Sequence, residues 1–285
     1  MIGELQASWS LFGDSYLAGW LIAVLLSVVG VWVVARDQIF LGAAVSQAST
    51  LGAALALWLE GVAATVGSHS LGSDALTALL AVTASVATAL LTSRATAPGR
   101  ESPEALTGWV YLIGASVPVL MLASSPHGLE EVQRLLISSI LGASRADVWL
   151  FLALVGATAV GVPLLRRRIV LFAMDSEMAA AVGMPARRWR LGTALWLGVA
   201  VGLSIHCAGM LYSFGILVLP ALVARSLCRE VAPMFAVAPA VALGTAVPGF
   251  LLADRLDVPP AQLAVALLCG LLALAWGLRA RLARS

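Results

Sequence analysis

The sequence contains no lysine and has few charged residues of any kind. Charged residues make up 11% of the 285 positions and hydrophobic residues 61%, whereas a soluble domain carries about 25% charged residues. All 17 basic residues are arginines, and the formal net charge is only +2. The composition excludes an ordinary soluble domain and indicates an integral membrane protein surrounded by the lipid bilayer. No nucleic-acid partner is expected.

Other absences narrow the chemistry. The three cysteines, Cys207, Cys228 and Cys269, are odd in number and lie in or beside apolar stretches, so neither a disulfide framework nor a structural zinc site is expected. The phosphate-binding pattern GxxxxGK(S/T) is missing, so any ATP is hydrolysed by a partner. The first fifteen residues hold Glu4 and Asp14 but no arginine, which favours a retained first span over a cleaved signal.

The apolar stretches predict an all-α, polytopic membrane protein with about eight to nine transmembrane helices, forming a single transmembrane domain over residues 1–285. Each stretch is close to the length of about 20 residues that a helix needs to cross a bilayer. Ten-residue alternating segments, which indicate a transmembrane β-barrel, are not evident. The candidate spans lie near 16–35, 39–59, 75–92, 105–123, 147–165, 191–209, 211–227, 231–251 and 260–278.

The positions of the arginines predict the orientation. With the N-terminus outside, fourteen of the 17 arginines fall on the cytoplasmic side, and only Arg134, Arg145 and Arg255 fall outside. Cytoplasmic loops of membrane proteins carry an excess of basic residues. We therefore expect the N-terminus outside and the C-terminus inside.

The second span, residues 38–58, carries polar residues in its middle. Ser46, Gln47, Ser49 and Thr50 interrupt an otherwise apolar stretch. Unpartnered polar groups are costly in hydrocarbon, so these side chains are expected to face other helices or a wet path. Ala43, Gln47 and Thr50 share one face, with Ser46 beside it. The pattern predicts a polar stripe along which a solute passes.

Residues 166–190 form the most informative polar segment. Asp175 is placed to cap a short helix and Glu177 to favour its N-terminal dipole. Ala179, Ala180 and Ala181 extend that helix, and Gly183 followed by Pro185 ends it. The segment near 174–186 is thus predicted to be a cytoplasmic docking helix, with an ordinary basic loop as the alternative.

His206 lies inside the sixth span, which makes it a candidate functional residue. His206, Met210 and Ser213 fall on one helical face, with Cys207 adjacent in sequence. Histidine, cysteine and methionine supply nitrogen and sulfur ligands to borderline or soft metals. A neutral imidazole bonded to a neighbouring helix is an equally good interpretation, and the residues alone leave both open.

Three smaller patterns also carry predictions. The hydroxyl residues of the third span, such as Ser85, favour close helix packing. Ser102 followed by Pro103 is typical of a helix start. Residues 129–136 have amphipathic spacing and predict an interfacial or re-entrant outer helix.

Three sequence blocks together resemble the integral permease subunits of the zinc/manganese/iron class of bacterial ABC importers. They are IFLGAAVSQASTLGAAL in the second span, MDSEMAAAVGMP in the predicted docking helix, and HCAGMLYSFGILVLPALVAR across the sixth and seventh spans. The resemblance covers nearly the whole chain, and the order of the blocks makes it specific.

The resemblance implies a multi-pass permease in the bacterial inner membrane that is not itself an enzyme. It implies a homo- or heterodimer of permeases, two cytoplasmic ATPase subunits and an extracytoplasmic metal-binding protein. Asp175, Glu177, Ala180 and Gly183 would contact the ATPase. No permanent cofactor is implied: a divalent zinc, manganese or iron ion is the cargo, and ATP binds only the partner.

The chain departs from the family pattern on the second span. Members place Asp and His four residues apart there, and the matching positions here are Ala43 and Gln47. Alanine offers no ligand, and an amide is a weak partner for these ions. His206 aligns with a family Gln. We hypothesise that Gln47 and His206 face each other across the path.

The leading interpretation is therefore a metal importer permease whose path is lined by Ser46, Gln47, Thr50, His206 and Met210, with His206 and Cys207 as metal-ligand candidates. A second interpretation is a permease without metal ligands whose different partner permease carries them. A third is an ion-coupled secondary carrier that needs no ATPase. The third usually requires a carboxylate well inside a span, and none is evident.

Overall fold

The computed structural model describes residues 2–65, 73–94, 102–123, 140–174 and 176–282. Within these residues the chain is entirely helical, and nine helices are long and apolar enough to cross a membrane. The helices are α1 (Ile2–Ala35), α2 (Ile39–Thr65), α3 (Ser73–Arg94), α4 (Pro103–Leu122), η1 (Ile140–Gly142), α6 (Arg145–Met174), α7 (Ser176–Ala181), α8 (Ala186–Ala208), α9 (Met210–Leu227), α10 (Val231–Leu256) and α11 (Pro260–Leu282).

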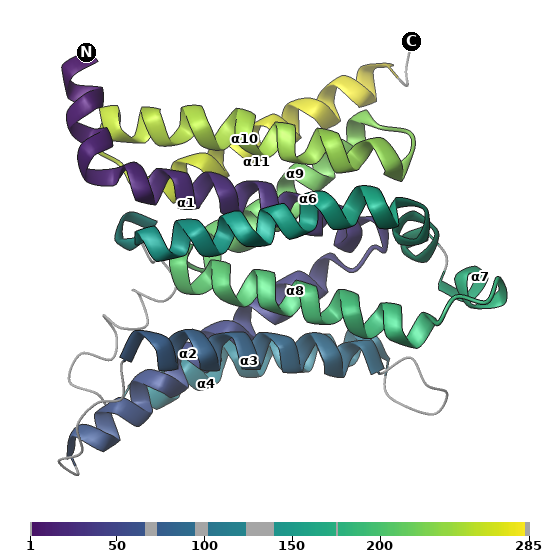
Figure 1. Cartoon of the computed structure of the whole chain (residues 1–285), viewed down its shortest axis with the longest axis horizontal. Helices are drawn as coiled ribbons and strands as arrows, with labels where there is room; N and C mark the ends of the chain where they lie inside the picture. Colours follow the sequence, from purple (N-terminus) through teal and green to yellow (C-terminus); the bar gives the residue numbers. More distant parts are fainter. Residues whose placement is uncertain (1, 66–72, 95–101, 124–139, 175, 283–285) are drawn as a thin grey trace. The chain divides into compact units, whose positions relative to one another are not determined.

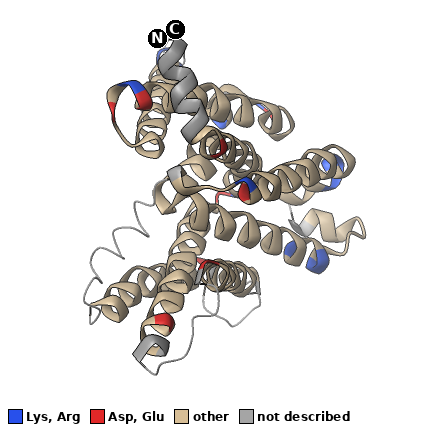
Figure 2. Cartoon of the chain, turned by 60° about the vertical axis from the view of Figure 1, so that its left-hand side comes forward, with Lys and Arg blue, Asp and Glu red and all other residues tan. Residues whose placement is uncertain are grey.

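The predicted all-helical membrane fold is confirmed, and each predicted span coincides with one long helix. Charged residues are few along the long helices (Figure 2), although Asp14 lies inside α1 and the arginine triplet 166–168 lies inside α6. This scarcity limits the charge in the hydrocarbon, where each charged side chain costs about 2.5–3.5 kcal/mol or more. The orientation with the N-terminus outside stays a prediction.

The helices pack into two compact units. Unit 1 comprises residues 1–37, 139–179 and 211–285, and unit 2 comprises residues 38–138 and 180–210. Unit 1 therefore contains α1, α6, α9, α10 and α11, and unit 2 contains α2, α3, α4 and α8. The chain leaves unit 1 for the first time after Asp37.

Unit 1 is built around α1, which packs against α6 and α10 (Figure 1). The Tyr212 hydroxyl of α9 donates a hydrogen bond to the Gly19 carbonyl of α1 at 2.9 Å. The ring of Phe250 lies 5.7 Å from that of Tyr212 and 5.8 Å from that of Tyr16. Buried aromatic rings at these separations add stabilising edge contacts to the apolar area that they bury.

Unit 2 consists of α2 packed on α3 and α4, with α8 against α3 (Figure 1). The Ser85 hydroxyl of α3 donates to the Gly198 carbonyl of α8 at 2.7 Å. A Cβ at Gly202 would lie 2.8 Å from the Val82 Cα, so the two backbones nearly touch. Small residues permit this close approach in membrane helices. The predicted packing role of Ser85 is confirmed.

The structure also tests the predicted helix boundaries. The Ser102 hydroxyl accepts a hydrogen bond from the Ala105 amide at 3.1 Å, which confirms the predicted cap of α4. The fifth span was predicted to end at residue 165, but α6 continues to Met174. Three consecutive arginines end the apolar run there, yet arginine is a good helix former. The predicted outer helix at 129–136 lies outside the described residues.

Candidate transport path and coupling segment

The polar row of α2 is buried in the middle of its helix. Ser46 and Ser49 are fully buried, and Thr50 and Gln47 are 3% and 7% exposed. The Thr50 hydroxyl donates to the Ser46 carbonyl at 3.2 Å, so this hydroxyl is satisfied by the backbone of its own helix. Short hydroxyl side chains commonly bond in this way in helices. All four residues belong to unit 2.

Two hydroxyls in this row have no partner. The Oγ atoms of Ser46 and Ser49 are buried and make no hydrogen bond to any residue that the structure describes. Leaving a buried polar group unsatisfied costs about 1–3 kcal/mol. Apolar residues would remove that cost. Unpaired buried hydroxyls are not confined to α2, because Ser204 of α8 and Ser213 of α9 are in the same state.

The remaining sides of α2 are occupied by its neighbours. A Cβ added at Gly114 of α4 would lie 2.8 Å from the Gln47 Cβ, so the base of the Gln47 side chain lies against α4. Ala44 and Ala48 pack on Val110 of the same helix. At about 100° per residue, Ser46 and Thr50 project away from this α4 face. Ser46 and Thr50 are thus directed away from the α4 side, whereas Gln47 lies beside α4.

The structure corrects the prediction that His206, Met210 and Ser213 share one helical face. Helix α8 ends at Ala208, Gly209 has a φ of 79°, and α9 begins at Met210. Glycine adopts this left-handed backbone conformation without the clash that a Cβ causes. His206 and Met210 therefore belong to different helices. Both side chains are partly exposed.

The helix contacts do not bring Gln47 and His206 to the same level. Gly52 of α2 approaches Leu80 of α3, whereas Gly198 of α8 approaches α3 six residues nearer its C-terminus. Because α2 and α3 run in opposite directions, Gln47 lies near the level of Gly198. His206 is eight residues further along α8, about 12 Å at 1.5 Å per residue. The hypothesis that Gln47 and His206 face each other stays a prediction.

Nitrogen and sulfur donors are sparse in the described part of the chain. It contains no group of three or more His, Cys, Asp or Glu side chains that could hold a metal ion. Cys207 is buried, but adjacent helical residues such as His206 and Cys207 point in directions about 100° apart. Their role as metal ligands stays a prediction. His69 and His127 lie outside the described residues.

The predicted docking helix is present as α7 in six residues. Ala180 and Gly183 are exposed, and Gly183 has a φ of 83°, which suits the glycine that ends a helix. Met178 and Val182 are 53% and 62% exposed. Asp175 lies outside the described residues, as does the side chain of Glu177. Contact of this segment with an ATPase stays a prediction.

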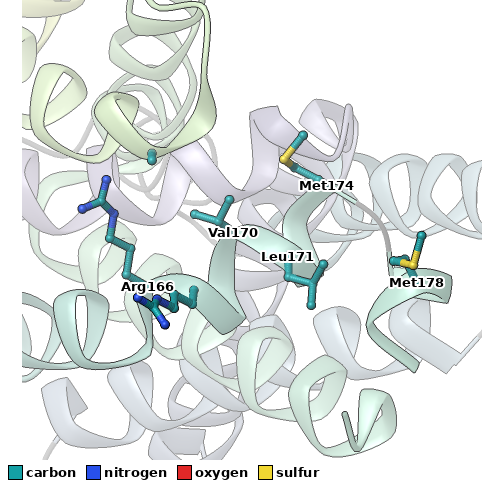
Figure 3. Close-up of a pocket in the computed structure, with 7 residues that line it drawn as sticks. Arg166, Val170, Leu171, Met174 and Met178 are labelled. Carbon is teal, nitrogen blue, oxygen red and sulfur yellow. The ribbon is translucent and has the colours of Figure 1, made fainter. Parts of the chain in front are cut away.

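Beside α7 lies a groove that the sequence did not predict. It has a volume of about 570 Å³ and belongs to unit 1. Figure 3 shows Arg166, Val170, Leu171 and Met174 along α6, and Met178 on α7. The groove is lined by Arg166, Arg167, Val170, Leu171, Met174, Met178 and Ala232. The signal in the sequence is the short apolar run at residues 169–174 (IVLFAM), which follows the three arginines and which the predicted end of the span at residue 165 left out.

The fold and the buried polar row define a polytopic membrane protein of the transporter type. The sequence profile described as the ABC 3 transport family matches residues 9–278, and the chain belongs to this family. It is accordingly a membrane-spanning permease subunit, and ATP hydrolysis is carried out by a separate subunit. The predicted resemblance is confirmed, and the secondary-carrier alternative is set aside.

Individual relatives agree with this assignment. The chain is 24% identical over 234 residues to the chelated iron transport system membrane protein YfeD of Yersinia pestis, covering 82% of this chain and 74% of YfeD. It is 21% identical over 269 residues to the manganese transport system membrane protein MntC of Halalkalibacterium halodurans, covering 94% and 87%.

Two solved structures share the fold. PsaBC from Streptococcus pneumoniae, solved in complex with Fab, matches with a TM-score of 0.76 at 14% identity and covers 97% of this chain and 95% of that chain. An inward-facing metal-chelate-type ABC transporter matches with a TM-score of 0.73 at 14% identity, covering 96% and 89%. At these identities the likeness concerns the fold alone.

Proposed function

We propose that this permease moves a divalent transition-metal ion, zinc, manganese or iron, into the cytoplasm across a bacterial inner membrane. The names of the relatives YfeD and MntC, which refer to chelated iron and manganese, support a metal cargo. The single structural observation that supports transport most strongly is the row of buried polar side chains on α2, in which Ser46 and Ser49 keep unpaired hydroxyls.

The proposed path is a conduit of weak contacts rather than a tight metal site. Ser46, Gln47 and Thr50 supply neutral oxygen atoms, which hold an ion or its water shell loosely. Conduction requires binding that is favourable enough to enter and weak enough to leave. His206 and Met210 are proposed to contribute further donors, at a different level from Gln47.

The proposed partner on the cytoplasmic side is a pair of ATPase subunits. Helix α6 is 30 residues long, about 10 residues more than a span requires. The excess begins at the arginine triplet and carries the groove, with Met174 70% exposed. An apolar floor edged by Arg166 and Arg167 fits a protein surface that offers apolar side chains and acidic groups. An extracytoplasmic metal-binding protein and a second permease complete the proposed assembly.

A second candidate function is that of the ligand-poor permease in a heterodimer. The absence of a three-donor group among the described residues favours it, as does alanine at position 43 where the family carries Asp. In this arrangement the partner permease supplies the metal ligands, and the present chain supplies one wall of the path.

Transport by reconstituted vesicles separates these candidates. The chain is purified with its ATPase and inserted into liposomes, and uptake of manganese, iron and zinc is measured by elemental analysis with and without ATP. Vanadate-treated vesicles are the control. ATP-dependent uptake by this chain as the sole permease supports a homodimeric importer. Uptake that appears only with a second permease supports the heterodimer, and no ATP-dependent uptake in either case overturns the proposed function.

A further inference from the structure

The turn after α1 is where the chain passes from unit 1 to unit 2. Helix α1 ends at Ala35, and Asp37 adopts a φ of 54°. A left-handed residue is common just after a helix, but it is usually glycine or asparagine because a Cβ is strained there. The Asp37 amide donates to the Val34 carbonyl at 3.1 Å, which closes the helix end. Aspartate also adopts this conformation elsewhere in the chain: Asp257 has a φ of 51° at the C-terminus of α10.

Arg225 of α9 binds this turn through one nitrogen. Its Nη1 donates to the Val34 carbonyl at 3.1 Å and pairs with the Asp37 carboxylate. A cation at a helix C-terminus interacts favourably with the partial negative charge of the unpaired carbonyls. The Arg225 and Asp37 side chains are 47% and 73% exposed, so the ion pair alone contributes little. The hydrogen bond from Arg225 to the Val34 carbonyl also joins α9 to the end of α1.

Arg36 attaches the same turn to the end of α6. Its guanidinium carbon lies 4.9 Å from the centre of the Phe172 ring and 5.1 Å from that of the Trp32 ring. Phe172 is 1% exposed and Trp32 8% exposed. A guanidinium held within about 6 Å of aromatic faces is attracted by them, more strongly where water is excluded.

Phe172 also stands next to the predicted docking segment. It lies two residues before Met174, which lines the groove, and between Leu171 and Ala173 in the last turn of α6. In this turn Met174 is therefore exposed and available to a docking partner, whereas Phe172 is buried against Arg36. We name Arg36, Asp37, Phe172 and Arg225 the inner clasp, and all of its members belong to unit 1.

We propose that the inner clasp couples ATPase docking to transport. The clasp converts movement of the end of α6 into movement of the turn at Asp37, and the covalent chain passes that movement directly to α2, which carries the polar row. Arg36 and Phe172 link the turn to α6. Arg225 holds the turn through its contacts with the Val34 carbonyl and the Asp37 carboxylate. These are positioning residues. The inference rests on the proposed function for the ATP-driven step, but not on the identity of the cargo.

The test uses the permease–ATPase complex in vesicles and compares matched variants. Phe172→Leu removes the ring under Arg36, and Phe151→Leu removes an equally buried ring from the other half of the same helix. Arg225→Ala breaks the ion pair, and Arg229→Ala removes an exposed arginine four residues away. Asp37→Gly keeps the left-handed turn accessible without the carboxylate. Metal uptake and ATP hydrolysis are measured on the same vesicles.

Phe172→Leu, Arg225→Ala and Asp37→Gly are expected to lower the metal moved per ATP by about fivefold or more, the lower end of typical coupling effects. The ATPase should co-purify in the normal ratio, and Phe151→Leu and Arg229→Ala should keep the wild-type ratio. Uptake and hydrolysis that fall in proportion, or a wild-type ratio in Asp37→Gly, would overturn the proposal, because a purely structural role gives those results.

A second readout does not depend on the cargo. Amide hydrogen exchange of residues 36–41 is followed in the complex with and without ATP and vanadate. The wild-type turn is expected to change its exchange rate on nucleotide trapping, and Phe172→Leu should abolish this response while Phe151→Leu retains it. If the wild-type complex responds to nucleotide but moves no metal, the proposed role of the inner clasp is supported and the proposed metal cargo is contradicted. A wild-type turn that ignores nucleotide overturns the clasp, whatever is transported.

Discussion

Buried hydroxyls in this chain differ in whether they have an acceptor among the described residues. Ser27 of α1 is fully buried and donates to the Val24 carbonyl at 2.9 Å, and Ser85 of α3 bonds α8. Ser46 and Ser49 of α2 are equally buried, yet their hydroxyls meet no acceptor among the described residues. Buried polar groups without partners are rare in folded proteins and point to an additional role.

Ser46→Ala is expected to raise the thermal stability or leave it unchanged, because it removes an unpaired buried hydroxyl worth about 1–3 kcal/mol of desolvation. The same substitution should slow ATP-driven metal uptake by about tenfold, equivalent to losing roughly 1.4 kcal/mol of contact with the passing ion or its water. Ser27→Ala is the control and should leave uptake unchanged. Thermal denaturation in detergent and vesicle uptake measure the two effects. Lower stability with normal uptake would assign Ser46 to packing.

The sequence predicted the polar row but not the state of its members. Four polar residues inside an apolar run are visible without a structure. Whether a hydroxyl is paired depends on the neighbouring helix. The relative heights of Gln47 and His206 along their helices depend on close helix contacts at residues such as Gly52 and Gly198. Such registers are set by packing between helices far apart in sequence, which a single-helix pattern does not contain.

The helices approach one another closely at glycines, because glycine has no side chain to keep the two backbones apart. A Cβ at Gly30 of α1 would lie 1.7 Å from the carbonyl oxygen of Leu217 in α9. This contact fixes α9, the helix that delivers Arg225 to the turn after α1. The approach is backbone to backbone, so no side-chain rotation relieves a collision there.

Gly30→Ala is expected to destabilise the protein by about 1–3 kcal/mol or more, because overpacking forces backbone shifts. Gly244→Ala on α10 is the control, since a Cβ there meets nothing within 4 Å. The control should be neutral or slightly stabilising, by about 0.5–1 kcal/mol, because alanine favours the helical state. Melting temperatures in the same detergent compare the two. Equal melting temperatures would contradict the close contact of α1 and α9.

Element boundaries were predictable where hydropathy alone decides them. All nine spans follow from apolar length. The continuation of α6 beyond residue 165 did not follow, because Arg166, Arg167 and Arg168 end the apolar run without ending the helix. The break at Gly209 was also not predicted. A single glycine with positive φ separates α8 from α9, so His206 and Met210 do not share one helix.

On the scale of the whole molecule, exposed apolar residues are present at the end of α6 and around α7. Met174, Met178 and Val182 are 70%, 53% and 62% exposed on a segment that extends beyond the length of a span. Contiguous exposed apolar surface in an aqueous position marks an interaction site. We propose that the ATPase subunit covers these residues, since the ABC 3 transport family assignment places ATP hydrolysis on a separate subunit.

Met178→Ser is expected to weaken ATPase capture by about tenfold, because a central apolar contact is worth roughly 1–2 kcal/mol. Leu227→Ser is the matched control, since Leu227 is 62% exposed at the end of α9 and is not among the residues of the groove. Co-purification of the ATPase with tagged permease, followed by titration, measures the affinity. Equal loss in both variants would show that the groove beside α7 is not the docking surface.

The central claim is that this permease carries a metal ion by ATP-driven import, and vesicle uptake tests it most directly. Vesicles that contain the chain and its ATPase are supplied with manganese, iron or zinc, and the metal retained after washing is measured with ATP, without ATP and with ATP plus vanadate. We predict accumulation of at least one metal only with ATP, and its loss with vanadate. Equal metal content under all three conditions, with the ATPase bound and hydrolysing ATP, would contradict the claim.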